Sequence, residues 1–469
     1  MAEKFDPPPN QQDSLTLGAL AIALGGYGIM ALTDYQLDNL AISGTIVIYT
    51  ACLLSYQAPN PPSPTPSTWA LPFFYGGLTV VLIALIALFP IHRAWQLSNI
   101  GFQALAARKY PAFEQYLTQA QKLAPWEAYY PWQLGWNLGN LALTAMDLEP
   151  QSRQAYSQRA IGHFQEGIKV SPYLEFGHNN LGWLQLSQNS PQASESFAQG
   201  LRLLPAKRGL FFALGLSFLA QQKPDLALEA FSLECLRDPL FITSPLWRSP
   251  GLAPFYPALL KKLPQDLGEL RQAQGQDPHL ASLLAQIQGG MYWWQGDWQQ
   301  AGPLIEKYGT PTAKFLLAWD AQPAMKADVA LLSTPASQVV EAWRSPPQRE
   351  QLLTQAWVGK TNSLLPPSLL AQLTNSMAQS STWGQWLRQK APALQYRRQR
   401  LGFGISMRHI DGPNPQDFYQ VVENLPLVTW FEEILPSPVL DPAWDLALQP
   451  RREQLWRLVN RPIGSKGQN

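Results

Sequence analysis

A pattern of prolines and small residues recurs in the first half of the chain and constrains its fold more than any other feature. Prolines stand at spacings of 47, 33 and 34 residues: Pro125, Pro172, Pro205 and Pro239. In the last three copies an alanine precedes the proline by twelve residues and a phenylalanine by eight, and a Leu-Gly pair lies further upstream. A period near 34 residues is typical of chains built from one repeated supersecondary unit.

The pattern predicts a series of helical hairpins. The glycine of the Leu-Gly pair lies on the first helix and lets the second helix approach closely, with the alanine at the crossing. The phenylalanine, one turn later, is expected to fill the groove towards the next hairpin, and the proline ends the second helix. The first copy departs from the pattern, with Phe113 in place of the alanine, and the second carries an insert near 143–156.

The arrangement Leu-Gly … Ala-x-x-x-Phe … Pro resembles the tetratricopeptide repeat (TPR), in four copies over 93–239. The resemblance implies an α-solenoid with a concave groove that binds a protein partner, in which each hairpin contacts only its neighbours. Its groove residues come from the first helix of each hairpin and suit an extended peptide. They are Tyr129, Gln133, Asn137, His178, Asn179, Gln185, Lys207, Arg208 and Phe211.

Three apolar runs without Asp, Glu, Lys or Arg precede the repeats, at 15–33, 40–56 and 69–89. Helices of these lengths cross roughly 30 Å of hydrocarbon, so the sequence predicts a membrane anchor over 1–91 with three spans in the lipid bilayer. Buried helices of a soluble core are the alternative. Lys4 on one side, against Arg93, Arg108 and Lys109 on the other, favours a multi-pass protein with a cytoplasmic repeat domain.

Composition agrees with an apolar anchor and excludes several classes of protein. Charged residues make up 14% of the chain, against about 25% in soluble domains. With 34 basic and 33 acidic residues there is no electrostatic footprint for nucleic acid. The 2 cysteines, Cys52 and Cys235, exclude a disulfide scaffold and a four-cysteine zinc site, and two buried free thiols are expected.

Beyond the repeat domain at 92–239 the pattern weakens, although the whole chain still reads as mainly α. Residues 240–310 are expected to be a proline-rich linker followed by a degenerate hairpin at 278–308. Four aromatic residues in that hairpin either cap the stack or form a sticky face: Tyr292, Trp293, Trp294 and Trp298. The region 311–469 is predicted to be helical, with a small mixed subdomain near 396–438 that contains a short strand.

The densest polar cluster is expected in that subdomain. It comprises Arg397, Arg398, Arg400, Arg408 and His409, followed by Asp411. The arginines could grip a phosphate or an anionic glycan carrier, with the histidine and the aspartate as an acid/base pair. The competing interpretation is a solvated basic face before an Asp-Gly turn. The chain contains no recognised catalytic, phosphate-binding or metal-binding motif, so neither an enzyme nor a cofactor or metal is predicted.

A second resemblance concerns the layout of the chain. The segments LTDYQLDNLAISGT and HRAWQLSNIGF, with an anchor joined directly to repeats, look like the C-terminal part of cyanobacterial O-antigen ligase/polymerase-like proteins. Their many-spanning catalytic core is absent here. The sequence therefore favours a membrane-anchored TPR scaffold that recruits or assembles a membrane complex, such as a photosystem. The alternative is a non-catalytic or split subunit of a polysaccharide assembly system.

Overall fold

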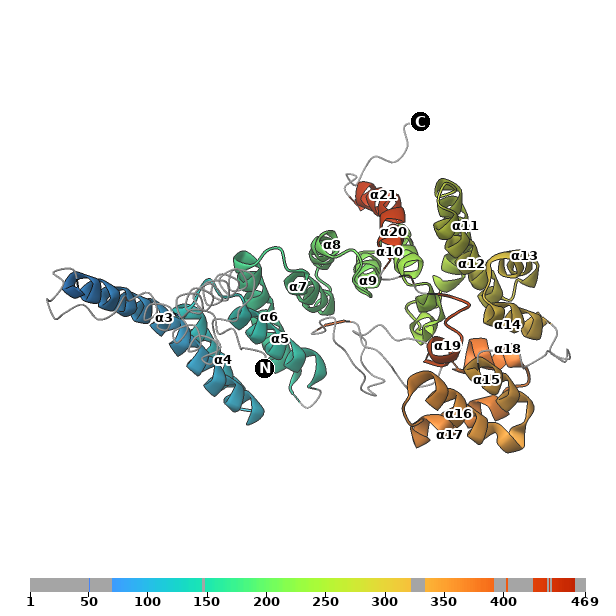
Figure 1. The fold of residues 1–469 in the computed structure, drawn as a ribbon, viewed down its shortest axis with the longest axis horizontal. Helices are drawn as coiled ribbons and strands as arrows, with labels where there is room; N and C mark the ends of the chain where they lie inside the picture. The colour runs from blue at the N-terminus through green and yellow to red at the C-terminus, as the bar shows by residue number, and fades with distance from the viewer. Residues whose placement is uncertain are drawn as a thin grey trace, which may run out of the picture. The chain divides into compact units, whose positions relative to one another are not determined.

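The computed structural model describes most of the chain from Ala70 onward, and these residues fold mainly into helices (Figure 1). The described residues are 50, 70–145, 148–321, 334–391, 402–403, 425–436, 438 and 441–459. Within these ranges no β-strand is present, so the mainly α fold class is confirmed. The chain forms two compact units, Met1–Phe89 and Pro90–Asn469, whereas the sequence suggested an anchor and three further regions.

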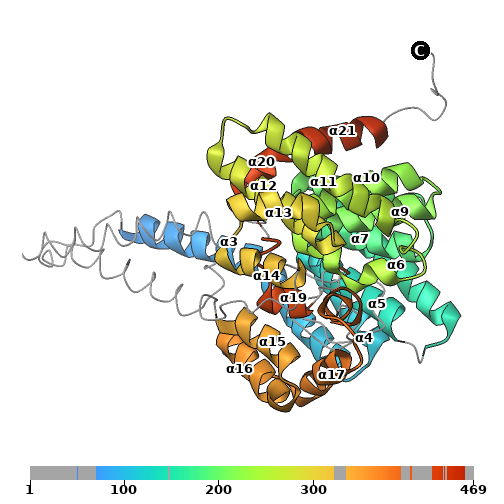
Figure 2. The same ribbon diagram turned by 90° about the vertical axis from the view of Figure 1, so that its right-hand side faces the viewer.

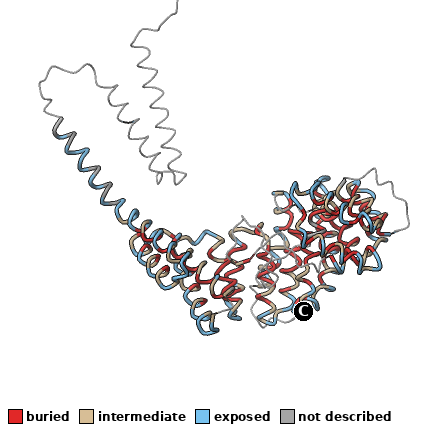
Figure 3. The backbone as a smooth tube through the Cα atoms, turned by 90° about the horizontal axis from the view of Figure 1, so that it is seen from below, coloured by how far each residue is buried: buried red, intermediate tan, exposed pale blue. Residues whose placement is uncertain are grey.

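The first long helix, α3 (Ala70–Ala106), contains the third apolar run. This run is not a separate element, because the helix continues through Pro90 into a polar stretch. Its described apolar side chains before Pro90 are exposed, with Ile86 at 73% and Phe89 at 69% (Figure 3). Across the described part of the chain, no helix combines the length and apolarity needed to cross a membrane. The predicted crossing at 69–89 is therefore not supported, and those at 15–33 and 40–56 lie outside the described residues, Thr50 apart.

The next seven helices pack against their neighbours in sequence. They are α4 (Tyr110–Leu123), α5 (Tyr129–Thr144), α6 (Pro150–Val170), α7 (Glu175–Ser187), α8 (Ala193–Leu203), α9 (Leu210–Ala220) and α10 (Pro224–Arg237). Helix α5 packs on α6, α7 on α8 and α9 on α10, and α7 also contacts both α5 and α9. Helices α4, α6, α8 and α10 each end two residues before a proline of the repeat, in keeping with the bias of the residue before a proline away from helical backbone.

The Leu-Gly pairs position these hairpins as predicted, with one difference. A Cβ atom on Gly182 would lie 2.7 Å from the ring of Phe197, and three ring carbons of Phe231 lie within 3.0 Å of the corresponding place on Gly215. The difference is that the phenylalanine packs onto the glycine of its own hairpin as well as towards the next one: the Phe164 ring lies 6.2 Å from the ring of Phe176 on α7, measured between centroids. The same contact recurs in the other hairpins, between Gly101 and Leu117, Gly135 and Phe164, and Gly289 and Ile305.

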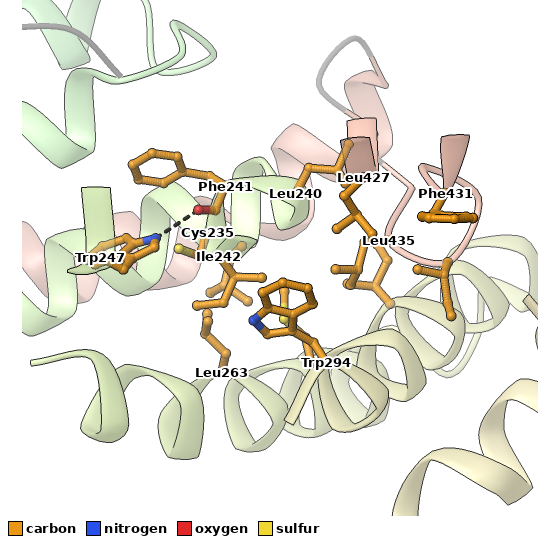
Figure 4. Close-up of a cluster of buried hydrophobic side chains, with 14 of the residues drawn as sticks. Cys235, Leu240, Phe241, Ile242, Trp247, Leu263, Trp294, Leu427, Phe431 and Leu435 are labelled. Carbon is orange, nitrogen blue, oxygen red and sulfur yellow. Dashed lines mark hydrogen bonds between the residues drawn. The ribbon is translucent and has the colours of Figure 1, made fainter. Parts of the chain in front are cut away.

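Residues 240–267, predicted to be an irregular linker with one short helix, form three helical segments, and the stretch 239–244 is buried. Two 3-10 helices, η2 (Pro239–Thr243) and η3 (Pro245–Arg248), precede α11 (Tyr256–Ala273). The Trp247 indole donates to the carbonyl of Phe241 at 2.8 Å, and both side chains lie in an apolar cluster with Leu240 and Ile242 (Figure 4). The prolines here start short helices, so a proline-rich sequence forms part of the core.

The predicted hairpin at 278–308 is present as α12 (Pro278–Gln295) packed on α13 (Trp298–Tyr308). Its aromatic residues belong to the core and form no exposed face: Trp293 and Trp294 are buried, and Tyr292 and Trp298 pack partly buried against the same cluster. They do not end the stack, because α14 (Pro311–Ala321) continues by packing on α13.

The C-terminal region adds further short helices. They are α15 (Thr334–Arg344), η5 (Pro346–Gln348), α16 (Arg349–Thr361), α17 (Pro367–Ala378), α18 (Trp383–Gln385), a π-helical turn at Trp386–Lys390, α19 (Leu425–Trp430), α20 (Pro442–Ala447) and α21 (Gln449–Val459). Most of the predicted mixed subdomain lies outside the described residues. Of its described part, Leu425–Trp430 is helical, and Gly402 makes an isolated β-bridge.

The last two helices return to the middle of the chain (Figure 2). Helix α21 packs on α10, and the Trp444 indole of α20 donates to the carbonyl of Leu236 at 3.2 Å. Arg451 forms an ion pair with the buried Asp266 of α11, at 3.2 Å. Contacts between residues about 200 positions apart thus close the second unit.

Candidate functional site

A cavity of about 390 Å³ lies among α6, α7 and α8. Most of its lining residues are of polar type, with four glutamines, a histidine and two charged residues, although apolar atoms form the larger share of the wall surface. The lining residues are Gln165, Ile168, Lys169, His178, Leu181, Gln185, Gln192, Glu195, Ser196 and Gln199. Two of the predicted groove residues, His178 and Gln185, therefore meet at this cavity.

The polar groups of the cavity fall into two kinds. On α7, Gln185 is buried and its Oε1 accepts from the Ser196 hydroxyl at 2.7 Å, while a His178 ring nitrogen lies 3.0 Å from the carbonyl of Pro172. These contacts hold the Gln185 and His178 side chains in place in the cavity wall. On α6 and at the start of α8, Gln165 and Gln192 are exposed. Because an amide side chain both donates and accepts, such a lining suits the N–H and C=O groups of a peptide backbone.

Asn179, next to His178, is a predicted groove residue that does not line the cavity. Its side chain is buried, and its Nδ2 has no hydrogen-bond partner among the described residues. A buried amide nitrogen without a partner is costly. The predicted groove residue is thus enclosed by protein, and it cannot present its side chain on an open surface.

The predicted groove residues of α5 remain accessible. Tyr129 is 43% exposed, and its ring lies 6.4 Å from that of Phe102. Partial burial, reinforced by the Glu127 carboxylate, raises the pKa of its hydroxyl. Asn137 Nδ2 donates to the backbone carbonyl of Gln133 at 2.8 Å, so these two side chains lie one turn apart on the same face.

The predicted residues of the fourth hairpin have structural partners. The Lys207 ammonium pairs with Glu175, and Arg208 Nη2 lies 2.5 Å from Asp238 Oδ2. Phe211 is 1% exposed, so its ring has no surface to offer a partner. The prediction that Phe211 lines the groove is wrong, because α9 packs against α7, α8 and α10 and most of its side chains are buried.

Sequence reasoning missed a buried carboxylate that holds the start of α9. Glu234 accepts from the backbone N–H groups of Gly209 at 2.7 Å, Phe211 at 3.1 Å and Phe212 at 3.2 Å. Gly209 has φ +79°, a conformation that favours glycine. Arg237, one turn after Glu234, lies 2.5 Å from its Oε1 and is also buried. The Glu-x-x-Arg spacing before a repeat proline was the available signal.

Cys235 lies beside this network and is a free, buried thiol, as predicted. Burial, together with the Glu234 and Asp238 carboxylates, raises its pKa well above the usual value. A thiol held in its neutral form is a poor nucleophile and a poor metal ligand. Cys52 lies outside the described residues.

A second missed cluster surrounds Arg388 in the π-helical turn. Its guanidinium donates to the carbonyls of Trp293 and Trp294, both at 3.0 Å, and pairs with Asp320. Burial raises the pKa of the Asp320 carboxyl, and the charge of Arg388 partly opposes this shift. The Arg248 guanidinium in turn donates to the carbonyls of Arg388 and Gln389. These contacts join η3, α12 and α14 to the π-helical turn, although the segments lie far apart in the sequence.

The basic cluster Arg397, Arg398, Arg400, Arg408 and His409 lies outside the described residues. Within the described ranges, no group of His, Cys, Asp or Glu side chains could hold a metal ion. When the chain is compared with known proteins, no protein-family model matches it, and neither does any curated protein.

Proposed function

We propose that this chain is a membrane-anchored, TPR-like scaffold that binds a protein partner and recruits or assembles a membrane complex. The observation that carries the proposal is the repeated hairpin contact, in which a glycine of the first helix receives a large side chain of the second. Five hairpins share it, from Gly101 with Leu117 to Gly289 with Ile305. Stacked hairpins of one kind build extended surfaces for partner recognition.

The cavity among α6, α7 and α8 is the proposed peptide-binding site. Its amide side chains match the alternating donors and acceptors of an extended backbone, and Lys169 and Glu195 offer charges of both signs.

The membrane part of the proposal rests on exposed apolar side chains of α3. Leu82, Ile83 and Ile86 are all at least half exposed on α3, and two further uncharged runs precede them in the sequence. Large exposed apolar patches mark surfaces that contact lipid or another protein. With Arg93, Arg108 and Lys109 following the last run, we propose a multi-pass protein whose hairpins face the cytoplasm.

Partner capture by the full-length protein tests this proposal. The chain would be purified from solubilised membranes, and co-purifying proteins identified, for the wild type and for a triple variant in which Gln165, Gln192 and Gln199 become alanine. Loss of a specific protein from the triple variant is expected. The matched control replaces Gln272 and Gln276, two exposed glutamines outside the cavity. An identical set of co-purifying proteins in all three samples would overturn the scaffold proposal.

The alternative, a split subunit of an O-antigen ligase/polymerase-like system, depends on the basic cluster at 397–409. That cluster lies outside the described residues, and no contact described above favours this function over the scaffold.

A further inference from the structure

One aromatic side chain from the C-terminal half of the chain packs into the second hairpin. Three ring carbons of Phe403 lie within 3.1 Å of the place that a Cβ atom on Gly139 would occupy. The ring also meets Phe164 of α6 edge-on, with centroids 6.2 Å apart and planes at 87°. We call this space over Gly139 and beside Phe164 the Phe403 slot. The slot exists because α5 carries no side chain at position 139.

Gly139 differs from Gly135 in what it receives. Gly135, one turn earlier on α5, is filled by Phe164 from its own hairpin. Gly139 is filled by a residue that belongs to no hairpin and is only partly buried. A glycine in the interior of a helix lowers its stability, and at Gly139 the missing side chain leaves the space that the Phe403 ring occupies. The position therefore behaves as a receptor for an aromatic side chain.

The slot and the cavity both border the same apolar cluster. Phe403 packs against the apolar cluster that contains Leu181 and Ile168, and both of these residues also line the cavity. An extended peptide bound to the amide side chains could therefore place an aromatic ring in the slot. The neighbours of Phe403 in sequence, Gly402 and Gly404, leave its backbone without bulky side chains on either side.

We propose that the Phe403 slot is the aromatic-anchor site for the partner, and that Phe403 occupies it in cis until a partner supplies its own ring. This inference rests on the proposed scaffold function and names the partner's chemistry: an extended segment with a phenylalanine between small residues. A ligand tethered to its own receptor acts at an effective concentration near the millimolar range. The free chain thus holds its site closed, and only a partner of matching sequence opens it.

Binding of a peptide in trans tests the competition. The probe is a fluorescein-labelled peptide of residues 398–408, which contains Phe403, and a second peptide carries alanine at that position. Each is titrated to about 1 mM into the full-length wild type, Phe403→Ala, and Phe403→Ala combined with either Gly139→Ala or Gly162→Ala. Gly162 on α6 is the matched control, because a Cβ there meets no atom within 4 Å. Circular dichroism verifies that all variants keep their helices.

We expect Phe403→Ala to bind the probe with an apparent Kd at least tenfold lower than the wild type, because its slot is vacant. Adding Gly139→Ala should abolish this gain and adding Gly162→Ala should preserve it, and the alanine peptide should not bind. Equal binding by wild type and Phe403→Ala, no binding by either, or tight binding despite Gly139→Ala would each overturn the inference.

Failure of this experiment differs from failure of the scaffold proposal. A wild-type protein that captures a membrane partner while Phe403→Ala binds no peptide would refute only the aromatic anchor. Peptide binding without any captured partner would leave the slot intact and refute the recruiting role.

Discussion

Replacing Gly215 with alanine places a methyl group where the ring of Phe231 now lies. Three carbons of that ring are within 3.0 Å of the new Cβ position, closer than ordinary van der Waals contact. The ring cannot move aside easily, because Phe231 is fully buried and is enclosed by Phe212 at 5.5 Å and Trp247 at 5.4 Å, measured between centroids.

Two opposing effects set the size of the change in the free energy of unfolding. Overpacking a tight core costs about 1–3 kcal/mol. The upper part of that range applies here because the enclosed ring of Phe231 has little room to move. Alanine returns about 1 kcal/mol through its better helix propensity. We therefore expect Gly215→Ala to lower the free energy of unfolding by about 1–2 kcal/mol. The same change at Gly162, where nothing lies within 4 Å, keeps only the favourable term and should stabilise by up to about 1 kcal/mol.

Hydrogen exchange measured by mass spectrometry on peptides from α9 and α10 reports the local effect. Protection in Gly215→Ala should fall about 5- to 30-fold, whereas Gly162→Ala should keep or gain protection in α6. Adding Phe231→Leu to Gly215→Ala should recover part of the loss, because the shorter side chain vacates the overlap. If Gly215→Ala stabilises the protein as Gly162→Ala does, the glycine does not determine hairpin packing.

Three further predictions follow from buried polar groups. Burial raises the pKa of Tyr256 to about 12, so between pH 10 and 12 the folded state binds more protons than the unfolded state. The free energy of unfolding should therefore fall by about 1–2 kcal/mol as the pH rises through this range. Tyr256→Phe should flatten this part of a plot of urea midpoint against pH, and an unchanged slope in the variant would contradict the prediction. Glu234→Gln strips the buried Arg237 of its counter-charge and should cost about 3–5 kcal/mol in urea unfolding, whereas full stability would show that the pair is dispensable. Iodoacetamide should label Cys235 in urea and not in the native protein, as followed by mass spectrometry of its tryptic peptide; rapid native labelling would refute its burial.

The parts of the fold that could be predicted from the sequence are those fixed by local chemistry. Proline ends a helix through its own ring, so Pro172 and Pro205 mark helix ends without knowledge of the rest of the chain. The spacing of Gly215 and Phe231 likewise identifies a close helix contact. That the phenylalanine also packs onto the glycine of its own hairpin was not predicted, since this contact depends on how the two helices are rotated.

The parts that escaped prediction depend on segments far apart in the chain. Phe241 and Trp247 stand in a proline-rich stretch that resembles a linker, and they become core because their rings pack against Phe212 of α9, in the preceding hairpin. The partners of Arg388 at Trp293 and Asp320 are about 70 to 95 residues away, beyond any local pattern. Of the predicted site, His178 and Gln185 meet at the cavity, but the burial of Phe211 and Asn179 required knowledge of the neighbouring helices.

The contact between Trp444 and the carbonyl of Leu236 joins residues 208 positions apart, which has a consequence for the growing chain. A ribosome adds about 5–20 residues per second, so α10 emerges about 10–40 s before the helix that covers it. During that interval α10 is packed on α9, but the part of its surface that α20 and α21 contact has no partner yet. The order of synthesis thus creates a period in which this part of α10 is prone to aggregation. The packing around α10 is completed only after the C-terminal helices have been made.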